Sequence, residues 1–263
     1  MATAASRIEI SAPLYREFPP SPKFAAHIEC FWVHRSNEPV RSYRVLPDGC
    51  SDIIFEQPAR NYGGLAIVGT MTHARAFDIP ARHATFGVRF RPGMGARLMG
   101  VPGSLVVDQS IPLADAWKAG VARELLEQLA ESESARESIG CLEAAFVEPP
   151  PLDAVDKALA WLAEARGQIA VETLAAAANV SVRQLRRLCI ARTGLSPKHL
   201  ARVLRFRHAA ALAAKPRRDW ADVALGCGYY DQAHLINEFQ ELAGVSPAQF
   251  PSLATSSPGL SAR

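Results

Sequence analysis

A run of basic side chains in the C-terminal part of the sequence has the clearest chemistry. The 36 residues from 183 to 218 carry eleven Lys or Arg and no Asp or Glu. A block of this kind is suited to an anionic surface such as the phosphate backbone of a nucleic acid. Residues 1–150 are near neutral, with 15 basic and 17 acidic side chains, and the net charge of the 263-residue chain is only +3. The charge distribution therefore predicts that the C-terminal part binds an anionic partner.

An internal repeat surrounds this basic block. Segments 173–197 and 222–247 align, with these residues at matching positions: Ala175 and Ala224, Asn179 and Gly228, Leu185 and Leu235, Cys189 and Phe239. Each copy has a short helix with a small Ala, a turn residue that tolerates positive φ, a polar N-cap (Ser181 or Asp231) and a second amphipathic helix. This order predicts two helix-turn-helix modules, each able to place its second helix in a DNA major groove.

The second helix of each module presents polar side chains on its predicted exposed face. The candidate DNA-binding residues are Arg183, Gln184, Arg186 and Arg187 in the first module and Gln232, Ala233, His234 and Asn237 in the second. Arginine donates to guanine edges or to phosphates, and Gln or Asn reads adenine. Because the second helix carries Asp231, Glu238 and Glu241 but no Lys or Arg, we expect the first module to dominate the affinity.

The segment between the modules predicts a helix over 197–213, opened by Ser196 as N-cap and Pro197 at the first helical position. At 1.5 Å per residue it is about 25 Å long. With the width of each module added, the two recognition helices would lie about 34 Å apart, one turn of B-DNA. One chain would then reach two successive major grooves. The alternative is a pair of helical hairpins packed for stability alone.

Residues 153–250 resemble the DNA-binding domain of AraC-type (AraC/XylS) transcriptional regulators. The resemblance is carried by residues 200–212 and by these positions of the second module: Ala224, Gly228, Tyr229, Gln232, Leu235, Phe239, Gly244, Val245, Ser246, Pro247 and Phe250. It implies about seven helices, recognition helices starting near Val182 and Gln232, and sequence-specific control of promoters, usually activation together with RNA polymerase. Asn179 and Cys189 depart from the family pattern, in which Gly and a large aromatic residue are common there.

The N-terminal part has the sequence pattern of β-strands. Short apolar runs broken by Pro, Gly and Asn predict strands over 29–34, 42–46, 52–55, 65–68 and 85–90, followed by a small helix over 94–99. The segments 46–56, 68–77 and 87–102, with Ile111, Pro112 and Leu113, resemble the N-terminal domain of one branch of AraC-like regulators. This resemblance implies a small cupin-like β-barrel that binds an effector or mediates dimerisation. The predicted fold is therefore α+β in two domains, a mainly β barrel with covering helices and an all-α domain.

Candidate effector contacts in the barrel are Asp48, Asp52, Arg89 and Arg91, since arginine binds carboxylate or phosphate groups bidentately. The alternative is that one of the two arginines is only a surface charge. The four histidines of this part lack the close spacing of a metal site. We predict neither a metal nor a cofactor.

Between the two parts, the spacing of apolar residues changes to every third or fourth position. Residues 113–147 predict two amphipathic helices that either cover the β domain or contact a second copy of the chain in a homodimer. Three prolines at 149–151 then predict a stiff linker. The expected domains are a β-rich sensor or dimerisation domain at 1–112, helices and linker at 113–151, the helix-turn-helix domain at 152–252 and a disordered tail at 253–263.

Composition excludes several classes of protein. Hydrophobic residues make up 49% and charged residues 21%, as in soluble globular proteins, and no stretch has the apolar length of a membrane span or a signal peptide. The five cysteines form no C-x-x-C pair and favour a reducing compartment. We expect a cytoplasmic, nucleoid-associated regulator that is not an enzyme and does not bind membranes. The alternatives are a DNA-repair protein with a methyl-accepting cysteine and a cupin enzyme fused to a DNA-binding module.

Overall fold

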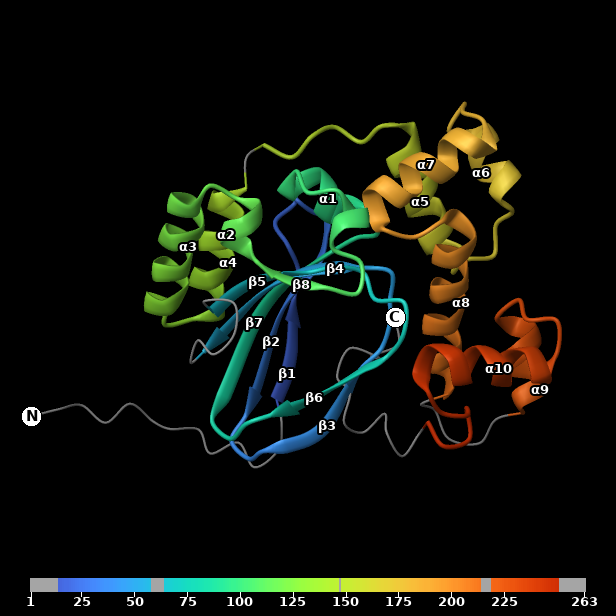
Figure 1. The fold of residues 1–263 in the computed structure, drawn as a ribbon, viewed down its shortest axis with the longest axis horizontal. Coiled ribbons are helices and arrows are strands. Elements are labelled where there is room, and N and C mark those ends of the chain that lie inside the picture. Colours follow the sequence, from blue (N-terminus) through green and yellow to red (C-terminus); the bar gives the residue numbers. More distant parts are fainter. Residues whose placement is uncertain (1–13, 58–63, 147, 214–218, 251–263) are drawn as a thin grey trace, which may run out of the picture.

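The computed structural model describes residues 14–57, 64–146, 148–213 and 219–250. Strands build the first part of the chain and helices build the last (Figure 1), so the α+β prediction is confirmed. The predicted tail at 253–263 lies outside the described residues. The domain boundaries remain predictions.

Six strands of the N-terminal part form one antiparallel sheet in the order β1-β2-β7-β4-β5-β8. They are β1 (Leu14–Phe18), β2 (Ile28–Ser36), β7 (His83–Phe90), β4 (Ser51–Gln57), β5 (Leu65–Val68) and β8 (Ser110–Pro112). A second, two-stranded sheet pairs β3 (Val40–Val45) with β6 (Arg75–Ile79). The mainly β prediction is confirmed. In the described residues these strands make two sheets, and not one continuous barrel wall.

Alternation along the strands gives the large sheet two unlike faces. On one face an apolar row crosses five strands through Phe31, Val88, Ile53, Ile67 and Ile111, which are paired in register. The first four of these side chains are almost completely buried. Because side chains alternate between the faces of a strand, their neighbours in sequence must lie on the other face.

Three helices cover the apolar face of the sheet (Figure 1). They are α2 (Leu113–Ala116), α3 (Ala119–Glu131) and α4 (Ala135–Ala145). Their apolar stripes contribute Leu113, Leu125, Leu129 and Leu142 to the same core as the sheet. This packing confirms the covering role predicted for residues 113–147.

The C-terminal part is all helical, as predicted, with six helices in its described residues compared with the expected total of about seven. They are α5 (Ala154–Glu164), α6 (Val171–Ala177), α7 (Val182–Thr193), α8 (Pro197–Ala213), α9 (Trp220–Gly226) and α10 (Gln232–Ala243). The predicted helix over 197–213 is found as α8, and that over 94–99 is α1 (Met94–Met99). A short 3-10 helix (Gly103–Leu105) follows α1.

One core joins these six helices, with α8 at its centre. Leu200, Val203, Phe206, Ala209 and Ala210 of α8 are fully or almost fully buried, so this helix packs on several sides. The small residues at 209 and 210 let neighbouring helices approach closely. The two helix-turn-helix modules are therefore attached to a single packed helix and not to a loose connection.

Candidate DNA-binding surface and N-terminal cavity

The first helix-turn-helix module is formed by α6 and α7. Asn179 takes a positive φ of 53° in the turn between them, where Asn is among the residues that reach this region at least cost. Ser181 caps α7 by accepting a hydrogen bond from the backbone N–H of Gln184 at 3.2 Å. Both local predictions for this module are confirmed.

The second module is formed by α9 and α10 in the same way. Gly228 takes a φ of 76° in the turn, and a Cβ atom there would approach the side chain of Gln168 to 3.1 Å. Asp231 caps α10 by accepting from the backbone N–H of His234 at 2.7 Å. The two predicted caps thus have equivalent roles in the two copies.

The candidate DNA-binding side chains of α7 lie on its outer face. Arg183, Gln184, Arg186 and Arg187 are all exposed, while Leu185 and Cys189 point into the core. Three guanidinium groups on the exposed face of one helix can bind base edges and phosphates of a DNA groove.

The face of α10 is neutral. Gln232, Ala233 and Asn237 are exposed, but His234 is half-buried, with its ring 5.2 Å from the ring of Tyr229 and its Nδ1 accepting from the backbone N–H of Tyr230. These contacts hold the ring of His234 at the start of α10, and its role in base contact stays a prediction.

Several arginines of the basic block are bound inside the protein, which sequence counting could not reveal. Arg192 forms ion pairs with Asp153 and Asp156 at 2.6 Å, and Arg207 pairs with Glu29 at 2.5 Å. Lys215, Arg217 and Arg218 lie outside the described residues. The exposed basic surface in the described part of the block thus centres on α7.

The acidic residues of α10 are also paired internally. Arg202 of α8 binds both Glu238 and Glu241, and Glu238 is buried. Asp231 is occupied as the N-cap. From the sequence we expected these three residues to weaken the binding of α10 to phosphates. The pairing with Arg202 offsets the repulsion from the two glutamates. The lack of cations on α10 is therefore the stronger reason to expect weak phosphate binding by this helix.

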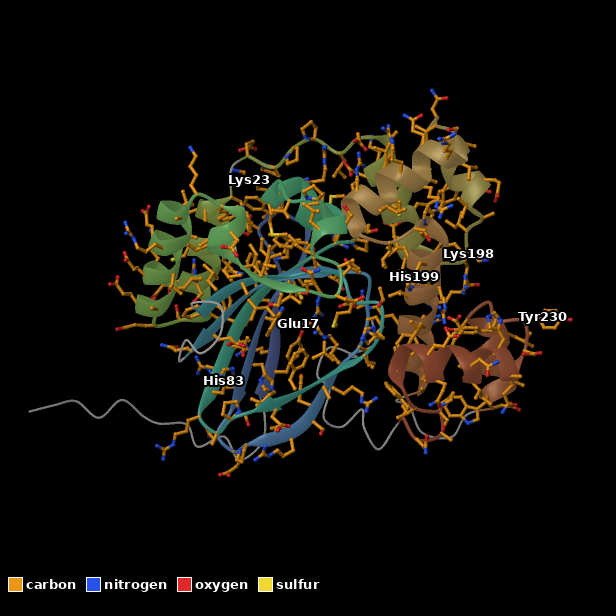
Figure 2. The ribbon with its side chains drawn as sticks, viewed as in Figure 1. Glu17, Lys23, His83, Lys198, His199 and Tyr230 are labelled. Carbon is orange, nitrogen blue, oxygen red and sulfur yellow. The ribbon has the colours of Figure 1, made fainter. Side chains whose placement is uncertain are left out.

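Two exposed residues beside the recognition helices are not among the candidates predicted from the sequence. Tyr230, directly before α10, is 87% exposed, and Figure 2 shows it projecting away from the rest of the molecule. Lys198 is exposed in the first turn of α8. In the sequence, Tyr230 lies between the turn residue Gly228 and the cap Asp231, where packing does not require a large ring. An aromatic residue at such a position is the feature that could have identified it.

A cavity of about 730 Å³ lies between the two sheets of the N-terminal part, and Phe206 and Arg207 of α8 also line it. Its floor is the second face of the large sheet, and β3 and β6 form part of its cover. The floor side chains fall in rows set by the strand register: Tyr15, His34, Thr85 and Glu56 in one row, Trp32 and Ile54 with Gly87 in the next, and Arg89 and Asp52 in a third. This size suits a small organic ligand.

Three of the four candidate effector residues meet at one end of this cavity. Arg89 Nε lies 3.3 Å from Asp48 Oδ2 and 3.5 Å from Asp52 Oδ1, and all three side chains are largely buried. Arg91 lies apart: it follows the end of β7, is exposed, and donates from Nε to the carbonyl of Ala25. The structure therefore separates the two arginines, and Arg91 does not line the cavity with the others.

The indole of Trp32 is held flat over the sheet. A Cβ atom at Gly87 would lie 2.4 Å from the indole ring, so only glycine leaves room for it. Trp32 Nε1 donates to Asp52 Oδ1 at 2.9 Å, and Tyr15 stacks on the ring with centroids 6.2 Å apart. This arrangement gives the cavity floor a fixed aromatic surface.

Asp52 is expected to titrate near neutral pH. Burial raises the pKa of Asp52 to about 6, although the positive charge of Arg89 opposes the shift. Because Trp32 donates to this carboxyl, tryptophan emission should change with a midpoint near that pH. The pKa is higher in the folded state than the ordinary value of about 3.9, so this group contributes less to the free energy of unfolding as pH rises from about 4 to about 6.

Fluorescence titration between about pH 5 and pH 8 checks this expectation. The step should be absent in Asp52→Asn and in Trp32→Phe. A step of unchanged size in Asp52→Asn would assign the titration to another group.

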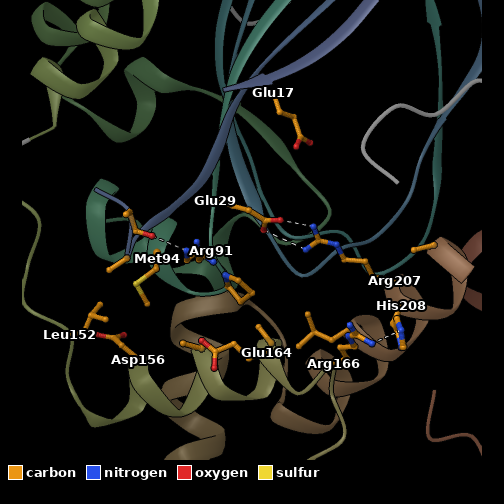
Figure 3. A pocket seen from close by; sticks show the side chains of 17 residues that line it. Glu17, Glu29, Arg91, Met94, Leu152, Asp156, Glu164, Arg166, Arg207 and His208 are labelled. Carbon is orange, nitrogen blue, oxygen red and sulfur yellow. Dashed lines mark hydrogen bonds and ion pairs between the residues drawn. The ribbon is translucent and has the colours of Figure 1, made fainter. Parts of the chain in front are cut away.

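A second cavity, of about 640 Å³, lies between the N-terminal part and helices α5 and α8 (Figure 3). Glu29 and Arg207 pair across it. Burial on its own would raise the pKa of Glu29, but the charge and hydrogen bonds of Arg207, together with Arg89 and Cys50, lower this pKa to about 2. On its far side Arg166 donates to His208 Nε2 at 2.7 Å. Arg91 lines this second cavity.

Both recognition helices are attached to the N-terminal part at their C-terminal ends. At the end of α7, Arg192 and Arg97 of α1 share the buried carboxylate of Asp156. At the end of α10, the backbone N–H of Ala74 donates to the carbonyl of Leu242 at 2.7 Å, and Arg44 of β3 donates to the carbonyl of Ala243. Thus the sheet that covers the cavity also contacts the second recognition helix.

Among the described residues, no group of three or more His, Cys, Asp or Glu is placed to hold a metal ion. In that same part of the chain, no helix has the length and apolarity needed to cross a membrane.

Two protein-family models match the chain. Residues 16–112 match a domain of unknown function (DUF6597), and residues 174–252 match a helix-turn-helix domain. A search of the curated proteins finds no match.

Similar solved structures include the DNA-binding domain of AdpA, described as a global transcriptional factor in complex with a target DNA. It is 30% identical, the match covers 38% of this chain and 92% of that chain, and the TM-score is 0.36. The C-terminal domain of AraT, a response regulator from Geobacillus stearothermophilus, is 27% identical over 38% of this chain and 84% of its own, with a TM-score of 0.35.

Apo ToxT from Vibrio cholerae is 10% identical over 90% of this chain and 99% of its own, with a TM-score of 0.42. Since all three TM-scores are low, the superpositions support no conclusion about the arrangement of the parts. The family model identifies residues 174–252 of the C-terminal part as a helix-turn-helix domain.

Proposed function

We propose that this chain, which belongs to the AraC-type transcriptional regulators, binds promoter DNA through the exposed faces of α7 and α10 and responds to a small effector in its N-terminal cavity. The observation that carries the DNA-binding proposal is the exposed arginine triad of α7, Arg183, Arg186 and Arg187. Gln232, Ala233 and Asn237 extend the surface on α10. In this proposal the first module supplies most of the affinity and the second adds selectivity.

The effector role is supported by the position of the cavity. The cover of the cavity contacts the end of α10 through Arg44 of β3 and through Ala74, directly before β6. Arg207 of α8 also lines the cavity. A ligand that shifts the cover or Arg207 would alter how the recognition helices are held. Asp48, Asp52 and Arg89 are the proposed polar contacts at one end; Arg91 is not included because it lies apart.

We further propose that the protein acts by binding and not by catalysis, in the cytoplasm on nucleoid DNA. Buried thiols argue against a methyl-accepting cysteine: burial raises the pKa of Cys30 to about 12 and that of Cys227 to about 11, whereas the thiolate is the nucleophile. We propose activation together with RNA polymerase, and a homodimer, from the family resemblance. The helices α3 and α4 add no support for a dimer, because their apolar stripes cover the sheet.

Selection of bound fragments from a random DNA library, followed by fluorescence anisotropy, tests the DNA-binding proposal. We expect a saturable complex whose affinity falls with salt, log K decreasing by about 0.9 per phosphate contacted for each decade of salt. A random fragment of the same length is the control. Equal affinity for the selected and random fragments, or an affinity independent of salt, would contradict the proposal.

A further inference from the structure

We propose that the N-terminal cavity binds a small organic cation, an ammonium or amidinium group on a flat or apolar body, with its charge at Glu56 and its body against Trp32. This inference rests on the proposed function in one respect, namely that the cavity is the effector site. It differs from an anion site built on arginine, which the sequence favoured.

The arginines that line the cavity all have other partners. Arg89 lies between the carboxylates of Asp48 and Asp52, and Arg207 is paired with Glu29. Arg75 donates to the carbonyl of Asp108, and Arg44 donates to that of Ala243. An anion approaching Arg89 would therefore meet two carboxylates at the same place, so this end of the cavity does not favour a ligand carboxylate or phosphate.

Glu56 is the carboxylate on the cavity floor for which the described residues provide no ion pair. Its Oε2 atom is buried and has no hydrogen-bond partner among them. A buried carboxylate oxygen without a donor is unfavourable, and a ligand N–H would remove that cost. Asp78 of β6, a lining carboxylate of the cover, is satisfied by Arg41 and by the backbone N–H of Ser42.

His34 provides a second polar group without a partner in the same row of the floor. It is only 4% exposed, lines the cavity, and its Nε2 has no hydrogen-bond partner among the described residues. Burial lowers the pKa of His34, and the neighbouring His83 adds to the effect. A neutral imidazole can accept a ligand N–H without repelling a positive charge, so His34 is compatible with a cation at Glu56.

Aromatic rings complete the surroundings of such a ligand. Trp32 and Tyr15 are stacked on the cavity floor, and Tyr43 of the cover lies against His34 with ring centroids 5.2 Å apart. Cations are attracted to the faces of Trp and Tyr, and more strongly when they are desolvated. A carboxylate without an ion pair among aromatic rings is a site for an organic cation.

Matched probes of opposite charge test this inference on the full chain. Benzamidine and benzoate share a ring and size, as do phenethylamine and 3-phenylpropanoate, and binding is measured by calorimetry. We expect each cation to bind at least about tenfold more tightly than its anionic partner. Glu56→Gln should remove that preference, while Asp78→Asn, at a carboxylate already paired with Arg41, should keep it.

Circular dichroism and the affinity for selected DNA without probe establish that Glu56→Gln is folded. Tighter binding of the anions, no binding of any probe, or an unchanged cation preference in folded Glu56→Gln would each overturn the inference. Cation binding that leaves DNA affinity unaltered would support the site and overturn its effector role. Failure of the DNA-binding proposal is seen separately, as equal affinity of the wild-type chain for selected and random DNA.

Discussion

Alanine at Arg183, Arg186 and Arg187 together is expected to weaken binding to selected DNA at least about 100-fold. All three side chains are exposed on one face of α7, and the described residues provide no ion pair for them. Loss of a base-contacting arginine weakens the free energy of DNA binding by about 1–3 kcal/mol. Loss of a phosphate contact reduces the slope of log K against log salt concentration by about one. Fluorescence anisotropy across a salt series measures both quantities.

The matched control is a variant in which three exposed arginines of the N-terminal part, Arg41, Arg123 and Arg136, are replaced by alanine. It removes the same charge from another surface. We expect its DNA affinity to stay close to that of the wild type, with an unchanged salt dependence. Equal weakening in both variants would mean that total charge, and not the face of α7, governs binding.

Asp156→Ala is expected to lower the free energy of unfolding by about 3–5 kcal/mol, the range for breaking a buried ion pair on one side. Asp156 is 0% exposed, pairs with Arg192 at 2.6 Å and with Arg97 at 3.3 Å, and accepts from the backbone N–H of Asp153 at 3.0 Å. Its removal leaves two guanidinium groups less compensated and breaks the capping box of α5.

Urea unfolding measures this effect, with Asp153→Ala as the comparison. Asp153 also pairs with Arg192, but its side chain is 44% exposed, so water can replace part of the lost interaction and the loss should be smaller. Hydrogen bonds from Arg192 lower the pKa of Asp153. Its contribution to stability is therefore present above about pH 4 and declines as pH falls further. A larger loss in Asp153→Ala than in Asp156→Ala would refute this ranking.

The local features of the helical part were predictable because they depend on residues close in sequence. The repeat located both turns and both caps, since Asn179 and Gly228 must take positive φ and Ser181 and Asp231 must satisfy nearby N–H groups. The length of α8 followed from its proline start and its apolar period.

The pairing of charges was not predictable, because the partners are far apart in the chain. Arg207 and Glu29 are separated by 178 positions, and nothing in the local pattern of either residue indicates the other. A count of basic residues therefore overstated the exposed charge. The cavity floor follows from the strand register, which the sequence leaves open.

Arg89 and Arg91 illustrate a different limit. Residues that are two positions apart in a strand share a face. However, β7 ends at Phe90 and the chain turns at Pro92 and Gly93, so Arg91 points elsewhere. The edge strands β1, β6 and β8 were missed because their sequences are short and lack a clear apolar alternation.

The hydrogen bond from Ala74 to Leu242 joins main chain to main chain. Replacing either side chain leaves the donor and the acceptor in place, so alanine scanning would pass over this link between the cover of the cavity and α10. Proline at position 74 would remove the donor. Related proteins can differ at these two positions and still keep this hydrogen bond. Tolerance to substitution at Ala74 or Leu242 is therefore no sign that the two segments are independent.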